Sequence, residues 1–231
     1  MRRMLLFLAA GSALTYAGFF PVTATAVVTE AEGNRITLSR SLGTPGVSGA
    51  LIHSFRGIDA MTGYVVQTDT PKKAERIALR VIAHDKLPGI KTPPQKGDKI
   101  IGGYLYRNVM ALAPDMATYR RIVDAYPSKT WFHPDLLAAF LSSKGEATPT
   151  PALLREFALT YQIGLFYIVK KDEAVLYDPV SQRVIARKPA KSTAKSAKFP
   201  FFMRFEKFRT GIFSDSSEAG GNYYDVMEQF Q

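Results

Sequence analysis

Short runs of alternating apolar and polar residues fill the first half of the chain, from Thr23 to about Tyr106. The run "TATAVVTE" leads to a turn at Gly33 and Asn34 and then to "RITLS", which also alternates. A period of two around a turn that tolerates positive φ predicts a β-hairpin. Similar runs recur between Gly, Pro and Asp residues, such as "ALIHSF", "TGYVVQTD", "RIALRVIAHD" and "DKIIGGYLY". This spacing predicts a β-rich domain over residues 22–106, folded as a small antiparallel barrel or sandwich.

After Tyr106 the pattern changes to a mixture of strands and helices. "NVMALAPD" is typical of a buried strand, and "MATYRRIVDAY" has apolar residues at helical spacing. "PDLLAAFLSSKG" and "PALLREFALTY" predict two more helices, the second with Thr150 as cap and Pro151 in its first turn. Three strands follow in "IGLFYIV", "AVLYD" and "RVIAR". Residues 107–187 are therefore expected to form a small α/β domain with three helices and a β-meander, which makes the fold class mixed α+β.

The residues after 187 differ in composition from both domains. "KPAKSTAKSAK" is basic and poor in bulky side chains, which predicts a basic linker over residues 188–198. "FPFFMRFEKF" contains five phenylalanines. Because so many exposed phenyl rings are costly, we expect residues 199–213 to pack on the core. The alternative is an exposed segment that docks on a partner or a membrane surface. Residues 214–231, aromatic in an acidic setting, are expected to form a flexible tail.

The N-terminus has the composition of a secretory signal peptide. Two arginines precede an apolar run from Met4 to Leu14, and the small residues Thr15 and Ala17 follow, placed as before a cleavage site. The run is too short to span a bilayer as a stable helix, so we expect residues 1–17 to be a signal peptide. An uncleaved anchor is the alternative. The chain has no cysteine, which excludes disulfides and favours the periplasm or the surface of a bacterial envelope over a eukaryotic secreted protein.

The stretch "WFHPD" holds the only tryptophan and one of three histidines. Pro134 suits the first turn of a helix, and Asp135 complements the positive end of that helix. Trp131 and Phe132 precede the helix and are expected to pack on its first turns as a staple. We interpret the stretch as the entrance of a helix, with His133 at or next to the N-cap.

The remaining histidines, His53 and His84, match no common metal-ligand spacing. Folding could still bring them together with His133 as a zinc site. A metal-dependent hydrolase built on such a site is the one enzymatic hypothesis that remains. The sequence contains no nucleophile elbow, phosphate loop, dinucleotide fingerprint or His-Glu-x-x-His motif. We therefore expect a protein that is not an enzyme and needs no cofactor.

The formal net charge is +10, a surplus that favours nucleic acid, an anionic membrane surface or acidic proteins as partners. Expected export argues against nucleic acid. Basic residues gather after residue 187, and a solvated tail is the alternative interpretation of that cluster. We predict that partner binding uses basic and aromatic residues of the last segments: Lys188, Lys191, Lys195, Lys198, Phe201, Phe202, Arg204, Tyr223, Tyr224 and Phe230.

Four stretches carry a resemblance: "KGDKIIGGYLYRNVMALAPDMATYRRI", "WFHPDLLAAFLSSKGEATPT", "IGLFYIV" and "FPFFMRFEKF". Together they resemble the N-terminal domain of the plasminogen-binding protein family (PgbA type) of Helicobacter and related bacteria. The similarity runs from about Val22 to Lys207, and "WFHPDLLAAFLS" is its most specific part. The resemblance implies an exported protein without enzymatic activity. In those members plasminogen capture is associated with a long charged C-terminal extension and a terminal lysine, whereas this sequence ends at Gln231.

The layout of a small barrel joined to an α/β unit is also similar to periplasmic flagellar-motor accessory proteins of the FlgT type, which is an analogy of fold alone. Three hypotheses follow. The first is an exported, non-enzymatic binding or scaffold protein of the cell envelope, with flagellar-motor components among its candidate partners. The second is a surface adhesin for a host protein such as plasminogen. The third is the metal-dependent hydrolase.

Overall fold

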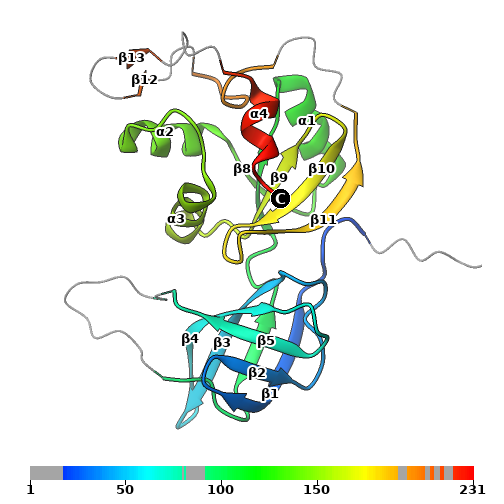
Figure 1. Cartoon of the computed structure of the whole chain (residues 1–231), viewed down its shortest axis with the longest axis vertical. Helices are drawn as coiled ribbons and strands as arrows, with labels where there is room; N and C mark the ends of the chain where they lie inside the picture. The colour runs from blue at the N-terminus through cyan, green and yellow to red at the C-terminus, as the bar shows by residue number, and fades with distance from the viewer. Residues whose placement is uncertain are drawn as a thin grey trace, which may run out of the picture.

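A computed structural model describes residues 18–79, 81, 92–191, 197–205, 209–210, 214–215 and 221–231. Within these ranges the chain forms a β-barrel and a second, five-stranded sheet that carries the helices, stacked along the longest axis (Figure 1). The predicted mixed α+β class with an N-terminal barrel is confirmed.

Six antiparallel strands close the barrel in the order β1-β2-β5-β4-β3-β6, with β1 pairing β6. Side chains of alternating residues, such as Val28, Leu51 and Ile100, fill its interior. The second half of the predicted strand "RIALRVIAHD" lies outside the described residues. The strands are β1 (Ala24–Glu32), β2 (Arg35–Leu38), β3 (Ser48–Phe55), β4 (Ile58–Gln67), β5 (Lys73–Ile77) and β6 (Lys99–Gly102).

The second sheet has the order β11-β10-β9-β7-β8, with β7 parallel to both of its neighbours and β9, β10 and β11 forming an antiparallel meander. The edge strand β11 includes Lys188 and Pro189, the first two residues of the predicted basic linker 188–198. Residues 192–196 of that linker lie outside the described residues. The strands are β7 (Asn108–Leu112), β8 (Thr130–Phe132), β9 (Leu165–Val169), β10 (Glu173–Asp178) and β11 (Arg183–Pro189). A separate two-stranded sheet pairs β12 (Arg209–Thr210) with β13 (Ser214–Asp215).

Side-chain caps mark the starts of two of the longer helices. The Asp115 side chain accepts a hydrogen bond from the Thr118 N–H, and Thr150 accepts one from the Leu153 N–H. Gly145 ends α2 at φ 74°, a left-handed conformation that suits glycine. The helices are α1 (Met116–Ala125), α2 (Asp135–Lys144), α3 (Pro151–Tyr161) and α4 (Tyr223–Glu228). Among the described residues, none of these helices has the length and apolar character needed to cross a membrane.

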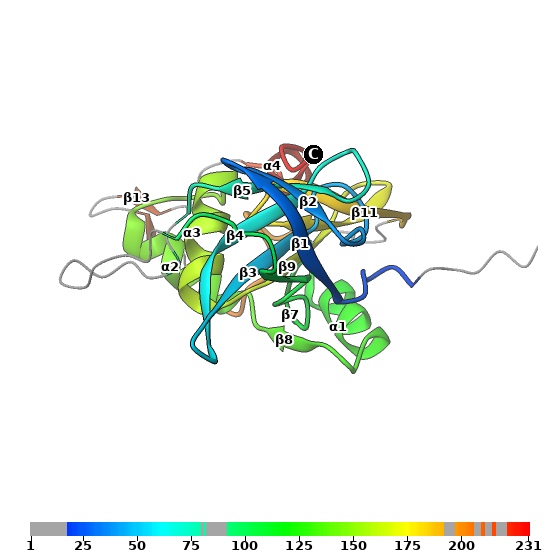
Figure 2. The same cartoon turned by 90° about the horizontal axis from the view of Figure 1, so that it is seen from below.

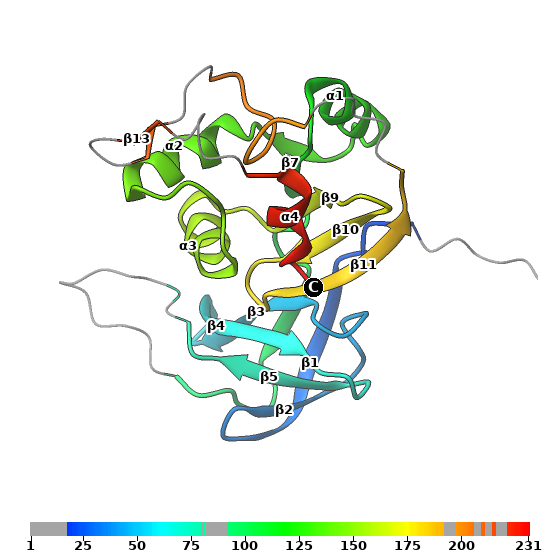
Figure 3. The same cartoon turned by 45° about the horizontal axis from the view of Figure 1, so that its top comes forward.

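Residues 221–231 pack on the fold, which corrects the expectation of a flexible tail over residues 214–231 for that part, and residues 216–220 lie outside the described residues. Tyr223, Met227 and Phe230 are each at most 1% exposed and pack against the second sheet. Their spacing of four and three residues places them along one side of a short helical segment. The acidic residues between them made this helical pattern hard to recognise in the sequence. Figure 3 shows α4 in front of β9 and β10.

The two faces of the second sheet have different covers. One face packs against α2, α3, α4 and the buried residues Phe201 and Met203. The other packs against α1, the residues Phe19 and Phe20, and the barrel. Seen from below, the barrel lies in front of the sheet (Figure 2). Because barrel and sheet residues share one hydrophobic cluster, the two modules are one packed unit.

Asp178 of β10 lies at this junction and is fully buried. Its Oδ2 accepts hydrogen bonds from the Ser48 N–H of the barrel at 3.0 Å and from the Tyr106 hydroxyl at 2.5 Å. Its Oδ1 accepts from the N–H groups of Val180 and Ser181 at 2.8 and 3.0 Å. Burial raises the pKa of Asp178 above its usual range, while these donors favour the ionised form. The carboxyl group therefore accepts four hydrogen bonds, and the two from Ser48 and Tyr106 join it to the barrel side of the junction.

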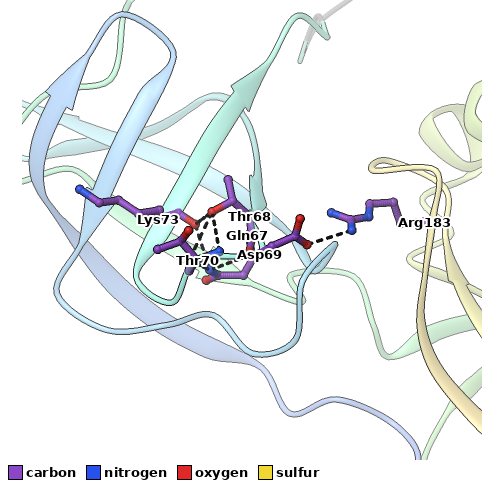
Figure 4. Close-up of polar contacts among 6 residues, drawn as sticks. All are labelled: Gln67, Thr68, Asp69, Thr70, Lys73 and Arg183. Atoms are coloured by element: carbon purple, nitrogen blue, oxygen red, sulfur yellow. Dashed lines mark hydrogen bonds and ion pairs between the residues drawn. The ribbon is translucent and has the colours of Figure 1, made fainter.

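The turn between β4 and β5 is organised by Gln67, whose side chain is buried (Figure 4). The amide nitrogen of Gln67 donates to the carbonyl oxygens of Thr68, Thr70 and Lys73. The ordered turn presents Asp69 to Arg183 of β11, at 3.0 Å between Oδ1 and Nη2. Both partners are largely exposed, so this ion pair adds little stability beside the buried Asp178 network.

Candidate binding site

An aromatic cluster lies on the face of the second sheet that α1 covers only in part. Tyr167 of β9 and Trp131 of β8 point from the sheet, and Tyr126 ends α1. Phe19 packs edge-on against Tyr167 at 5.5 Å between ring centroids, and Phe20 packs against Tyr126 at 4.9 Å. Segments far apart in the sequence thus build one aromatic surface.

Trp131 corrects the predicted staple at the entrance of α2. In β8, successive side chains point to opposite faces of the sheet. Trp131 therefore packs with Phe20 and Tyr167, whereas Phe132 packs on the side of α2. A strand of three residues is too short to show a period in the sequence.

Lys188 of β11 places a positive charge over the aromatic cluster. Its Nζ lies 4.7, 5.1 and 5.3 Å from the ring centroids of Phe19, Tyr126 and Tyr167. It also donates a hydrogen bond to the Tyr126 hydroxyl at 2.8 Å. Burial alone would lower the pKa of Lys188, but hydrogen bonds with the two tyrosine hydroxyls outweigh it and raise the pKa. Lys188 therefore stays a fixed cation at neutral pH.

A second lysine stacks on the other side of the cluster. Lys129 Nζ lies 4.3 Å from the Phe20 ring centroid and donates to the Tyr106 carbonyl oxygen at 3.1 Å. Burial and the neighbouring Arg107 lower the pKa of Lys129. The aromatic cluster is therefore bordered by cations on two sides.

A groove of about 270 Å³ opens between α1 and the β10–β11 edge. Ile122, Val169 and Ala174 are buried and form part of its apolar floor. Among the described residues, its polar lining includes three cations and two phenols and no carboxylate: Arg121, Lys188 and Lys191 with Tyr126 and Tyr167. We call this site the cationic groove. Its composition suits an anionic group attached to an apolar body, which it can hold by charge and by contact.

A larger cavity of about 410 Å³ lies on the barrel but has a different chemistry. Its lining mixes the carboxylates of Glu30, Glu32 and Glu75 with the cations of Arg35 and Lys73. Opposite charges side by side leave little net preference for a charged ligand. The cationic groove is therefore the better candidate despite its smaller volume.

Of the residues predicted to bind a partner, Lys188 and Lys191 line the cationic groove. Lys198 instead donates to the carbonyl oxygens of Met203 and Phe205 at 2.6 and 2.7 Å. Arg204 is bound to Asp135, which accepts from its Nε at 2.6 Å and from its backbone N–H at 2.8 Å.

The predicted aromatic residues lie mostly in the core. Phe201, Phe202, Tyr223 and Phe230 are buried, so in this structure they hold the fold and present little surface to a partner. Tyr224 is half-buried. Lys195 lies outside the described residues, and binding by any of the predicted set stays a prediction.

Arg121, Tyr126 and Tyr167 were missed by sequence reasoning. Each belongs to an element whose own pattern is explained by packing, and only the contact of α1 with the sheet brings them together. The one available signal was the Arg120–Arg121 pair on a helix that is otherwise amphipathic.

The two described histidines, His53 and His133, have structural partners. His133 lies next to the N-cap of α2, as predicted, and its Nδ1 accepts from the Asp135 N–H at 3.2 Å. Burial lowers the pKa of His133, which favours the neutral ring that can accept this bond. His53 of the barrel contacts Asp98 at 2.7 Å between Nδ1 and Oδ1. His84 lies outside the described residues. Within the described part of the chain, no three His, Asp or Glu side chains gather as metal ligands.

The family described as "plasminogen-binding protein pgbA N-terminal" matches residues 22–229. The chain belongs to this family. The match spans the barrel, the second sheet and the cationic groove, and it confirms the resemblance seen in the sequence. The family is one of binding-protein domains and is not a known enzyme family. No curated protein and no solved structure matches. The flagellar-motor role receives no support from these comparisons and stays a prediction.

Proposed function

We propose that this chain is an exported, non-enzymatic binding protein of the bacterial cell envelope, and that plasminogen is its first candidate partner. The single observation that carries the proposal is the family match over residues 22–229, which covers nearly the whole described fold. The match includes both modules and their junction, so the similarity extends to the complete packed unit.

The roles of the reactive side chains support binding over catalysis. His133 accepts a hydrogen bond from the first residue of α2, and Asp178 joins two modules from a fully buried position. The cationic groove, in contrast, offers charge and aromatic surface without a nucleophile paired to a base in its lining. Such a surface suits recognition of a partner.

The direct test measures binding of plasminogen to the immobilised full chain by surface plasmon resonance, with serum albumin as the control analyte. We expect saturable binding of plasminogen and none of albumin. A lysine analogue added as competitor blocks the lysine-binding pockets on plasminogen and leaves other contacts intact. It therefore distinguishes binding through those pockets from binding through other contacts. Absence of saturable plasminogen binding would remove plasminogen as the partner.

The cellular part of the proposal has its own test. The apolar N-terminal run with its preceding arginines supports export. We expect the protein in the envelope fraction, and an adhesin is also cleaved by protease added to intact cells. Recovery of the protein only from the cytoplasm would contradict export.

A further inference from the structure

We propose that the cationic groove receives an acidic segment of the partner protein, with a carboxylate held between Arg121 and Lys191 above Lys188. The inference rests on the proposed function only in taking the partner to be a protein. It names the chemistry of the contact, which nothing in the family description assigns.

The three cations of the groove play different parts. Lys188 is held in place by the rings of Phe19, Tyr126 and Tyr167 and by its hydrogen bond to the Tyr126 hydroxyl, so the position of its charge is fixed. Arg121 and Lys191 are exposed at the rim. A fixed charge below two adaptable ones can surround a carboxylate from three sides.

The charge of the groove is not neutralised by its own lining. Asp124 lies on α1 and Asp172 lies in the turn before β10, but neither lines the groove. Glu173 is paired instead with Arg187 at 2.6 Å between Oε1 and Nη1. No carboxylate among the residues that the structure describes lines the groove, so an incoming carboxylate would meet positive charge that this lining does not compensate. Charge complementarity therefore favours an acidic ligand.

The size and floor of the groove select a peptide among anionic ligands. About 270 Å³ holds one or two side chains, and the floor of Ile122, Val169 and Ala174 is apolar. In a peptide with an acidic residue beside an apolar one, the acidic side chain can meet the cations and the apolar side chain can contact the floor. A nucleic acid draws its affinity from many phosphate contacts along a basic track, which a groove of this size does not provide.

The experiment uses two short fluorescein-labelled peptides of equal length, one with glutamates flanking a leucine and one with glutamines in their place. Binding to the full chain is measured by fluorescence anisotropy at low and at high salt. We expect binding of the glutamate peptide, weaker at high salt because the charges are screened, and little binding of the glutamine peptide.

The decisive variant is the double substitution Arg121→Glu with Lys191→Glu. We expect it to weaken binding of the glutamate peptide by at least about tenfold, since rim charges become repulsive. The matched control is Arg120→Glu with Lys171→Glu, which changes net charge equally at exposed positions outside the groove. The control is expected to keep binding within about twofold of the original chain. If both double variants lost affinity for the glutamate peptide equally, the inference would be overturned in favour of a general charge effect.

Plasminogen measured with the same variants separates this inference from the proposed function. If plasminogen binds the original chain and the groove variant equally well, the groove inference is wrong and the proposed function stands. If plasminogen fails to bind but the glutamate peptide binds through the groove, the inference stands and the partner is another acidic protein. Equal competition by a DNA oligonucleotide or by anionic vesicles would overturn the assignment to a peptide.

Discussion

The two faces of the second sheet are built by different means. The face under α2, α3 and α4 is closed by apolar side chains, including Phe157, Phe201 and Phe230, each fully buried. The opposite face is closed only in part, and its open portion contains tyrosines and lysines around the cationic groove. The comparison teaches that one face supplies stability and that the other leaves polar groups available for recognition.

The largest effect is expected on the closed face. Phe201→Ala removes a fully buried ring and should lower the free energy of unfolding by about 3–5 kcal/mol, because a cavity replaces it. Phe205, in the same segment, is 44% exposed, and its change to alanine should cost less than about 1 kcal/mol. Urea unfolding of both variants checks the contrast. Similar losses would mean that the segment does not pack as described.

The next effect concerns the junction between barrel and sheet. Asp178→Asn replaces one carboxylate oxygen, which accepts hydrogen bonds, with an amide NH2 that cannot accept them, and should cost about 2–3 kcal/mol. Asp69→Asn at the exposed pair with Arg183 is the matched control and should cost less than about 1 kcal/mol. Thermal unfolding compares the two. A Tm for Asp178→Asn equal to that of the control would contradict the role of the buried carboxyl.

A smaller effect is expected on the open face. Phe20→Ala removes contacts with Tyr126, Trp131 and Lys129 but leaves no closed cavity, so a loss of about 1–2 kcal/mol is expected. Val22 is 84% exposed, and Val22→Ala should leave the free energy of unfolding nearly unchanged. If Phe20→Ala were as costly as Phe201→Ala, the two faces would not differ in the way described.

The smallest effect is that of a charge on the open face. Lys188→Met should cost about 0.5–1 kcal/mol at neutral pH, because cation–π contacts are lost. The pKa of Lys188 is raised in the folded state, so its stabilisation is complete below the ordinary value of 10.5 and disappears as pH rises through the folded pKa. Unfolding free energies of both proteins, measured from neutral to alkaline pH, should converge above pH 10.5. A difference that stays constant would show that lost packing causes the effect.

The sequence predicted most of the elements whose local pattern is strong. Period-two runs gave the barrel strands, and Thr150 with Pro151 marked the start of α3. The short strand β8 and the helix α4 were missed, because three residues show no period and six residues in an acidic setting resemble a tail.

The candidate site could be predicted only in part. Lys188 and Lys191 stand out as basic residues in the sequence, but Arg121 and Tyr167 join them through packing of α1 on the sheet. The predicted aromatic binders Phe201, Tyr223 and Phe230 are core residues for the same reason. Composition identifies side chains that are costly to expose, and tertiary contacts decide whether a partner or the protein itself covers them.

The buried bridge between Asp178, Ser48 and Tyr106 has a consequence for how the molecule melts. If the modules separated, Asp178 would lose two donors, the Ser48 N–H would lose an acceptor, and both modules would lose shared apolar contacts. Calorimetry of the intact chain should therefore record a single heat-absorption peak, and a cut between the modules should leave two pieces that aggregate.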